Sequence, residues 1–313
     1  MHKTAILFQL HSLDRLPEFD KLLSRLDNIS IFLSINNKNQ HNHDLDHFIH
    51  KYKDKIENIT FHKNYGVDIA PFLQQIKQLN AEKFPYFIKL HSKSSFFGIK
   101  RNIDWGSILI DSLIGSRYIF EQNQKILYYN HHGMVCNRYF TLTQNQGNNI
   151  QKIQHLCKIL GIDYDKVKDM SFAAGSMYTS KTKLFQKYLA QHIDYLDLLL
   201  SNEVGKVDDG KTTNGTYSHA LERICGYLVH NEDLKIVPTI SKNYVIFNTE
   251  YRKLHLQITY NDIAYLTEDA HIYGEIIENN TKFVRIKWLH LDKNTITEYI
   301  KISDNKLIRS SNY

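Results

Sequence analysis

The sequence predicts an α/β fold, in which a mostly parallel sheet lies between flanking helices and a small antiparallel β meander follows. Short apolar runs alternate with helix-spaced segments in the first part of the chain, whereas apolar and polar residues alternate one by one after about Tyr251. Of the 313 residues, 42% are hydrophobic, which is enough for one large α/β domain with a small appendage. We therefore expect a first domain over residues 1–250 and a β-rich appendage, packed on it, over residues 251–313.

In the first half of the large domain, apolar runs predict strands, and apolar residues three or four positions apart predict helices. A turn at Asn64-Tyr65-Gly66 leads into the third helix. The expected elements are a strand at 5–11, a helix at 14–26, a strand at 29–35, a helix at 44–55, a strand at 59–61, a helix at 68–79 and a strand at 86–90. Strands and helices that alternate in this way favour parallel pairing.

The second half is less regular, and the meander follows it. We expect a helix at 104–120, a strand at 126–129, a polar stretch at 143–149, a helix at 150–160, a strand with a small-residue bend at 171–178, and helices at 182–191 and 216–229. Alternating segments at 273–277, 283–288 and 297–302 are separated by turns rich in Asn or Asp, which is typical of an antiparallel meander.

Charge and composition restrict the partners. The formal net charge is +6, which suits an anionic ligand or an acidic membrane surface. The lysines are scattered and no arginine-rich stripe is present, so we expect no nucleic acid partner. No segment reaches the roughly 18 to 20 apolar residues of a membrane span, and the N-terminal apolar run is too short for a signal peptide. We therefore expect a cytoplasmic protein.

The three cysteines, Cys136, Cys157 and Cys225, have neither metal-ligand nor redox spacing. Each lies among apolar neighbours, which indicates buried thiols in a reducing cytoplasm.

Ligands bind at the carboxyl ends of the strands in an open parallel sheet, so the residues just after each strand are the candidates. His11 and Ser12 follow the first strand, either as an ordinary polar loop or in contact with a nucleotide base. After the third strand, Gly66 permits a backbone conformation closed to other residues, and Asn64 lies beside it. Asp68 stands where it could cap a helix or contact a ligand.

The clearest candidate is the end of the fourth strand. Because side chains alternate along a strand, Lys89, His91 and Lys93 are expected on one side, with Ile88 and Leu90 in the core. Cationic groups gathered there repel one another, and a diphosphate would offset them, aided by serine hydroxyls such as that of Ser94. Snorkelling lysines at a solvated strand end are the alternative.

Two later segments carry further candidates. Gly175 and Ser176 lie in a run of small residues that permits close approach to a ligand or to another strand. His219, Glu222 and Arg223 fall on adjoining parts of one helical face. They could provide a catalytic base, an acceptor-binding carboxylate or a helix-capping salt bridge.

Several familiar motifs are absent from the sequence. Asp44-x-Asp46 lies at a predicted helix start rather than after a strand, and neither a Walker loop nor a Gly-x-Gly-x-x-Gly fingerprint occurs. The histidine pairs at 41/43 and 131/132 lack matched ligand spacing, so we read them as surface histidines. We expect neither a metal nor another cofactor.

Taken together, these motifs resemble the rhamnan synthesis protein F family of bacterial polysaccharide glycosyltransferases, over about residues 5 to 230. The blocks that carry the resemblance are residues 64–73, 89–95, Trp105, 174–177 and 214–223. The resemblance implies a GT-A-like (Rossmann-like) fold. It also implies transfer of rhamnose or a related sugar, such as galactofuranose, from a nucleoside-diphosphate donor to a cell-surface polysaccharide or lipopolysaccharide acceptor.

The resemblance also implies partners and roles. The partners are a dTDP- or UDP-linked sugar, a glycan or lipid-linked glycan, and peripheral contact with the inner membrane or other glycosyltransferases. The basic strand end occupies the place of the acidic metal motif, so transfer would be metal-independent. The donor diphosphate would be held by His11, Asn64, Gly66, Asp68, Lys89, His91, Lys93 and Ser94. The acceptor or sugar would contact Trp105, Gly175, Ser176, Glu222 and Arg223.

The catalytic base follows less directly. The family's common Asp-Gly-Thr appears here as Asn214-Gly215-Thr216, and an amide cannot accept the proton of an acceptor hydroxyl. The base is then expected among Asp209, Asp208 and Glu203, with His219 nearby.

Two rival functions remain at this point: a non-catalytic glycan-binding or scaffold subunit of a polysaccharide assembly complex, and a different group transferase that uses a nucleotide-activated donor. If the transferase reading holds, replacing Lys89 by alanine should abolish turnover without unfolding the chain.

Overall fold

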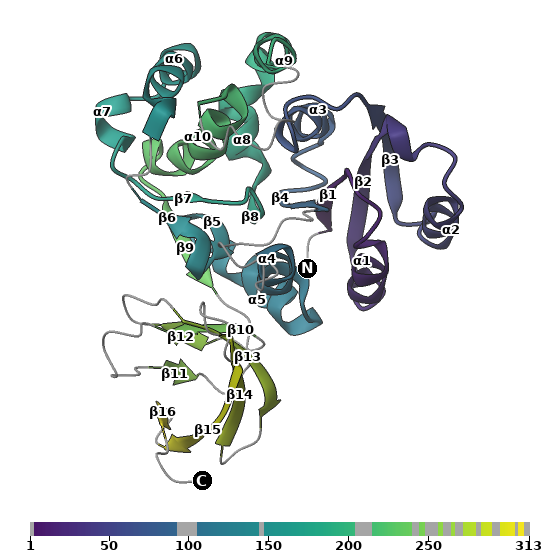
Figure 1. Ribbon diagram of the computed structural model, residues 1–313. Helices are drawn as coiled ribbons and strands as arrows, with labels where there is room; N and C mark the ends of the chain where they lie inside the picture. The colour runs from purple at the N-terminus through teal and green to yellow at the C-terminus, as the bar shows by residue number, and fades with distance from the viewer. Residues whose placement is uncertain are drawn as a thin grey trace.

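The computed structural model describes residues 3–92, 105–143, 147–203 and 215–239, together with the backbone of the strands that follow. The first sheet has the strand order β3-β2-β1-β4-β8-β5-β9 (Figure 1). Its strands are β1 (Thr4–Leu10), β2 (Ile29–Asn36), β3 (Ile56–His62), β4 (Tyr86–His91), β5 (His132–Asn137), β8 (Tyr178–Lys181) and β9 (Lys235–Thr239). Only β8 runs antiparallel to its neighbours, so the predicted mostly parallel sheet is confirmed.

Helices cover both faces of this sheet. One face packs against α1 (Leu16–Leu23), α2 (His43–Lys51), α4 (Trp105–Ile114) and α5 (Arg117–Leu127). The other packs against α3 (Ile69–Gln78), α6 (Ile150–Leu160), α8 (Thr182–Leu189), α9 (Ile193–Ser201) and α10 (Tyr217–Asn231). The central strands are therefore buried on both sides, which is why β1 is apolar almost throughout instead of alternating.

Three short elements complete this part of the chain. They are the helix α7 (Tyr164–Val167) and the strands β6 (Thr141–Leu142) and β7 (Phe172–Ala173), which pair as a small antiparallel sheet. The predicted strand at 171–178 is thus two strands, β7 and β8, with the residues between them in a turn.

The predicted strand at 126–129 is wrong. Ile126 and Leu127 end helix α5, Tyr128 and Tyr129 follow it, and the strand lies farther on, at His132–Asn137. Asn123 and Gln124 hid the helical pattern, because both are polar but buried in α5. The amide of Asn123 donates to the carbonyl groups of Ser112 and Leu113, which explains why a polar residue is tolerated there.

The single helix expected at 104–120 is also wrong. It is divided between α4 and α5 at Gly115 and Ser116, where the hydroxyl of Ser116 accepts a hydrogen bond from the Ile119 amide at 3.1 Å. A serine in this role starts a new helix. The helices α7 and α9 and the strand β9 were not predicted at all.

The second large sheet has the order β10-β13-β14-β15-β16-β11-β12. Its strands are β10 (Tyr244–Phe247), β11 (Leu256–Ile258), β12 (Ala264–Leu266), β13 (Ile272–Asn279), β14 (Phe283–Leu289), β15 (Thr295–Ser303) and β16 (Lys306–Arg309). The consecutive strands β13 to β16 pair antiparallel, which confirms the predicted meander. The domain division at residue 250 and the packing of the appendage stay predictions.

Gly226 allows α10 to lie directly on β7. A Cβ atom at this position would come within 2.6 Å of the Phe172 Cα and 2.7 Å of the Ser171 carbonyl oxygen. Because these are backbone atoms, Gly226→Ala should lower the free energy of unfolding by about 3 kcal/mol, as measured by urea denaturation. The control is Gly161→Ala, which meets no atom within 4 Å and costs only its left-handed backbone, about 1 kcal/mol. Equal losses would contradict this explanation.

Glu57 on β3 joins the amino-terminal ends of the central strands. Its carboxylate accepts from Lys83 at 2.9 Å, Ser30 at 2.8 Å and Lys3 at 3.2 Å. Hydrogen bonding from Lys83, then from Ser30, lowers the pKa of Glu57 to about 2. Its stabilisation is therefore complete above the unfolded pKa of 4.5 and is lost as the pH falls toward 2.

Glu57→Gln should accordingly lower the free energy of unfolding at pH 7 by about 1–2 kcal/mol, after allowance for solvent screening. The wild-type advantage over this variant should shrink between pH 4.5 and pH 2.5 in urea titrations. An advantage that is independent of pH would show that the charge of Glu57 is not responsible.

Candidate functional site

The candidate site lies at the carboxyl ends of β1, β2 and β4, where the strand order reverses beside β1. The hydroxyl of Ser92, just after β4, accepts hydrogen bonds from the His11 and Ser12 amides, both at 2.8 Å. His11 Nδ1 accepts from the Asn36 side-chain amide at 3.2 Å. His11 and Ser12 are thus joined directly to residues at the ends of β2 and β4.

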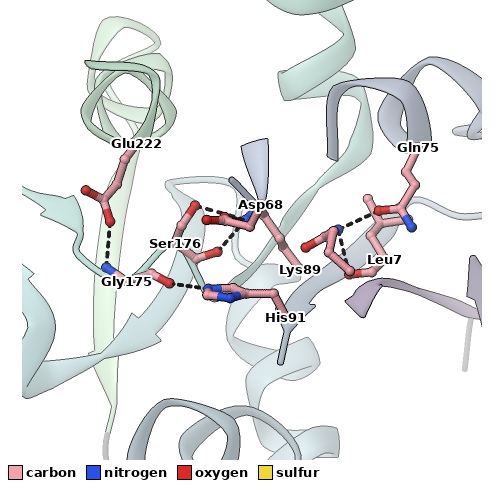
Figure 2. Close-up of polar contacts among 9 residues, drawn as sticks. Leu7, Asp68, Gln75, Lys89, His91, Gly175, Ser176 and Glu222 are labelled. Carbon is pink, nitrogen blue, oxygen red and sulfur yellow. Dashed lines mark hydrogen bonds and ion pairs between the residues drawn. The ribbon is translucent and has the colours of Figure 1, made fainter. Parts of the chain in front are cut away.

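Lys89 is buried completely, with an exposed fraction of 0%. Its ammonium pairs with the Asp68 carboxylate and donates to the Ser176 carbonyl oxygen at 2.8 Å and the Ser176 hydroxyl at 2.9 Å (Figure 2). A lysine ammonium has three hydrogens, and these contacts account for all of them. The expectation that Lys89 offers an uncompensated charge is therefore corrected, because the fold supplies its anion.

Asp68 stands at the start of α3 but does not cap it, since its side chain makes no capping hydrogen bond there. Its carboxylate is directed to Lys89 instead. The preceding turn is unusual, with φ of +63° at Gly66 and +54° at Val67. The first value confirms the predicted role of glycine, whereas a β-branched residue in this region is strained.

Helix α3 is fixed on the sheet by two buried glutamines that sequence reasoning missed. Gln75 of α3 donates to the Phe32 carbonyl oxygen at 2.7 Å. Its own amide oxygen accepts from Gln9 of β1 at 2.5 Å. Buried amides that bind across elements in this way specify their arrangement. They help to keep Asp68 at the end of β4.

The turn at Gly175 and Ser176 is held from several sides. His91 Nε2 donates to the Gly175 carbonyl oxygen at 2.8 Å, and the Gly175 amide donates to the Glu222 carboxylate at 2.7 Å (Figure 2). Both residues adopt left-handed backbone, with φ of +84° and +57°. Four predicted site residues therefore meet Lys89 and Asp68 in one hydrogen-bonded network: His91, Gly175, Ser176 and Glu222.

On α10, Glu222 and Arg223 have different surroundings. Glu222 keeps a side-chain exposure of 17%, whereas Arg223 is buried and stacks over the Phe172 ring at 4.8 Å. Burial lowers the pKa of Arg223, opposed by the charge of Glu222. Arg223 also donates to the His219 carbonyl oxygen at 2.7 Å, and His219 Nδ1 lies 2.7 Å from the Thr216 hydroxyl. Arg223 and His219 thus brace the start of α10.

Glu203 was predicted as a candidate base, but its contacts are structural. One carboxylate oxygen accepts from the Tyr217 amide at 2.6 Å and the other lies 3.0 Å from the Lys152 ammonium. With only 6% exposure, Glu203 has little access to an acceptor hydroxyl.

Sequence reasoning did not bring together Tyr178 of β8 and Cys225 of α10, which lie near Asp68 and Glu222 of the network. The Tyr178 hydroxyl is buried, and burial raises the pKa of Tyr178 well above its ordinary value, with further contributions from Cys225, Asp68 and Glu222. Burial likewise raises the pKa of Cys225 to about 11 and those of Cys136 and Cys157 to about 12. All three thiols are buried, as predicted.

Some predicted residues are not in contact with this network or cannot be placed. Asn64 is exposed near Gly66. Lys93, Ser94, Asp208 and Asp209 lie outside the described residues, and the side chain of Trp105 is also outside them. Among the residues that are described, no three His, Cys, Asp or Glu side chains gather where they could hold a metal ion. No helix in the described part of the chain combines the length and apolar character needed to cross a bilayer.

Comparison with known proteins adds the family. No curated protein matches the chain. The family model described as rhamnan synthesis protein F matches residues 1–234, which include every strand of the first sheet except β9 and every residue of the network above. Membership of this family indicates a transferase that acts in polysaccharide synthesis. The chain belongs to the rhamnan synthesis protein F family.

Proposed function

We propose that the protein is a glycosyltransferase that moves rhamnose or a related sugar from a nucleoside diphosphate to a hydroxyl of a bacterial cell-surface glycan. Galactofuranose is a second candidate sugar. The donor is proposed to be dTDP- or UDP-linked, and the acceptor a glycan or lipid-linked glycan, used at the cytoplasmic face of the inner membrane.

One observation carries this proposal. Asp68, Lys89, His91, Gly175 and Glu222 come from four separate blocks of the sequence, yet they converge at the carboxyl edge of the sheet. Burying these charged and polar groups costs desolvation free energy. Such a network is best explained at a place where side chains must be held in a fixed geometry for binding or chemistry. Convergence at the edge where α/β folds bind ligands, in a polysaccharide-synthesis family, supports sugar transfer.

The proposed chemistry is direct displacement. The acceptor oxygen bonds to the anomeric carbon while the bond from that carbon to the diphosphate oxygen breaks, and the diphosphate leaves with the electron pair. A carboxylate takes the hydroxyl proton; Asp209 is our first assignment and Asp208 the second. Glu203 is no longer proposed, because its oxygens bind Tyr217 and Lys152.

In this proposal the network holds the Gly175–Ser176 turn in place and does not itself bind the whole diphosphate. Since the Lys89 hydrogens are already used, direct contact with the leaving group is assigned to Lys93 and Ser94, and Lys89 and His91 hold the Gly175–Ser176 turn. His11 and Asn64 remain proposed contacts of the nucleoside, and Trp105 of the sugar or acceptor.

Donor screening tests the proposal. The purified protein is incubated with dTDP-rhamnose or UDP-galactofuranose and a rhamnose-terminated oligosaccharide, and mass spectrometry is used to look for a product one sugar larger. We expect a product that still forms in EDTA, since cationic side chains are proposed to replace a metal. Loss in EDTA that manganese restores would reject metal independence. Glycan binding without nucleoside-diphosphate binding in calorimetry would favour a non-catalytic glycan-binding subunit.

A further inference from the structure

Glu203 and Gly215 stand at the two ends of the segment that carries the proposed base, and one lysine bridges them. Lys152 of α6 lies 3.0 Å from the Glu203 carboxylate and also donates to the Gly215 carbonyl oxygen. The second carboxylate oxygen of Glu203 accepts from the Tyr217 amide at 2.6 Å. The end of α9 is thereby tied to the start of α10 through a side chain of α6.

Gly215 is held a second time. Asn149, which is completely buried just before α6, accepts a hydrogen bond from the Gly215 amide at 2.8 Å. Asn149 and Lys152 are three positions apart, so they lie on one side of the start of α6 and bind both polar backbone groups of Gly215. The φ of +94° at Gly215 is one that glycine adopts without strain.

Aromatic side chains support the bridge. The Lys152 ammonium lies 5.2 Å from the centre of the Tyr217 ring. The Tyr217 hydroxyl is 2.9 Å from His155 Nδ1, and the His155 ring packs edge-on against Tyr195 at 6.4 Å. A cation over an aromatic face gains attraction from the ring, and the ring in turn is fixed by His155. The ammonium is therefore restrained from several directions.

Charge explains why a cation is needed here. Glu203 is 6% exposed, and its carboxylate faces the same ammonium as the Gly215 carbonyl oxygen. Without Lys152, the Glu203 carboxylate and the Gly215 carbonyl oxygen would face each other with no donor between them. The buried charge of Glu203 would also lose the cation that compensates it. Glu203 would keep the Tyr217 amide, whereas the Gly215 carbonyl group would lose its partner in the bridge.

We propose that Lys152 is a positioning residue for sugar transfer, because it fixes the two ends of the segment that carries Asp208 and Asp209. The inference rests on the proposed function, but its geometry depends only on described residues. Lys152 touches neither donor nor acceptor in this proposal. It acts through Glu203 and Gly215.

The test compares Lys152→Met with Lys152→Arg. We expect Lys152→Met to lower kcat by about 10- to 100-fold with the donor KM changed less than about threefold, since misplacing a catalytic group affects the chemical step. Lys152→Arg keeps the charge and two donors and should restore most of the activity. Tyr217→Phe is the matched control, because it loses the His155 bond but keeps the ring and the bridge; kcat should stay within about twofold.

A second readout does not depend on activity. Hydrogen exchange at the Gly215 amide should accelerate at least about tenfold in Lys152→Met, because the Gly215 carbonyl group loses its bond to Lys152 and this end of the segment opens more often. The Tyr217 amide, which Glu203 still binds, should change less, and Lys152→Arg should restore protection at Gly215. If Lys152→Met is poorly folded, the double variant Lys152→Met/Glu203→Gln, which leaves no unpaired buried charge, replaces it.

The outcomes separate the two proposals. If the wild type transfers sugar and Lys152→Met keeps wild-type kcat, the positioning role is overturned. An equal loss in Lys152→Met and Lys152→Arg would overturn the claim that the charge is responsible. A wild type that transfers no sugar from any donor overturns the proposed function instead, while the exchange measurement still decides whether Lys152 fixes the two ends.

Discussion

Lys89→Met should lower the free energy of unfolding by about 3 kcal/mol and abolish sugar transfer. The substitution leaves the Asp68 carboxylate, only 13% exposed, without its cation and removes both donors to Ser176. Breaking one side of a buried ion pair is costly because the remaining charge is stranded. Chemical denaturation gives the stability, and product formation at saturating donor gives the activity.

The double variant Lys89→Met/Asp68→Asn distinguishes charge from position. It should recover about 2 kcal/mol, because the buried carboxylate charge that Lys89 compensates is removed together with Lys89. It should stay at least about 100-fold less active than the wild type, because the Ser176 turn still lacks its anchors. Wild-type stability and turnover in Lys89→Met would contradict both roles. The sequence alone predicted that Lys89 could be removed without unfolding the chain, and its burial changes that expectation.

Glu222→Ala should reduce kcat/KM by about 100-fold, whereas Glu222→Gln should remain within about tenfold of the wild type. The Gly175 amide donates to Glu222 at 2.7 Å, and a glutamine side-chain oxygen can still accept this hydrogen bond. Alanine leaves the Gly175 amide without that acceptor and loosens the turn against which substrate is proposed to bind. Steady-state kinetics with both substrates varied measures the difference.

A matched control for Glu222 exists on α5. Glu121→Ala removes a partly buried helical glutamate that pairs with Arg117, at 28% exposure, outside the network. It should leave kcat/KM within about twofold. If Glu222→Ala is equally harmless, Glu222 has no part in the site. If Glu222→Gln loses as much activity as Glu222→Ala, the charge of Glu222 matters rather than its hydrogen bond.

The first sheet was largely predictable because its central strands are buried on both faces. A strand such as β1 is then apolar almost throughout, and such runs stand out between amphipathic helices. The prediction failed where a buried residue is polar. Asn123 and Gln124 occupy core positions of α5, so the apolar spacing there breaks and Ile126 and Leu127 resemble the start of a strand.

The site was predictable in its position but not in its contacts. The sequence placed Asp68, Lys89 and His91 near strand ends, and the parallel order of the sheet brings them to one edge. Nothing local showed that Asp68 pairs with Lys89, or that Gly175 binds His91 and Glu222. Glu203 illustrates the same limit, since the amide and the ammonium that bind it belong to α10 and α6.

The sequence by itself therefore determined the alternation of strands and helices in the first half of the large domain, the family and the set of polar residues at the carboxyl edge, because apolar periodicity and motifs are local properties of the sequence. The tertiary structure decided which of these residues are paired. Ser176 lies 87 positions from Lys89, and only the antiparallel pairing of β8 with β4 brings its carbonyl oxygen to the ammonium. A charge that looked available to a ligand is thus neutralised within the fold, because its partners are set by packing rather than by sequence spacing.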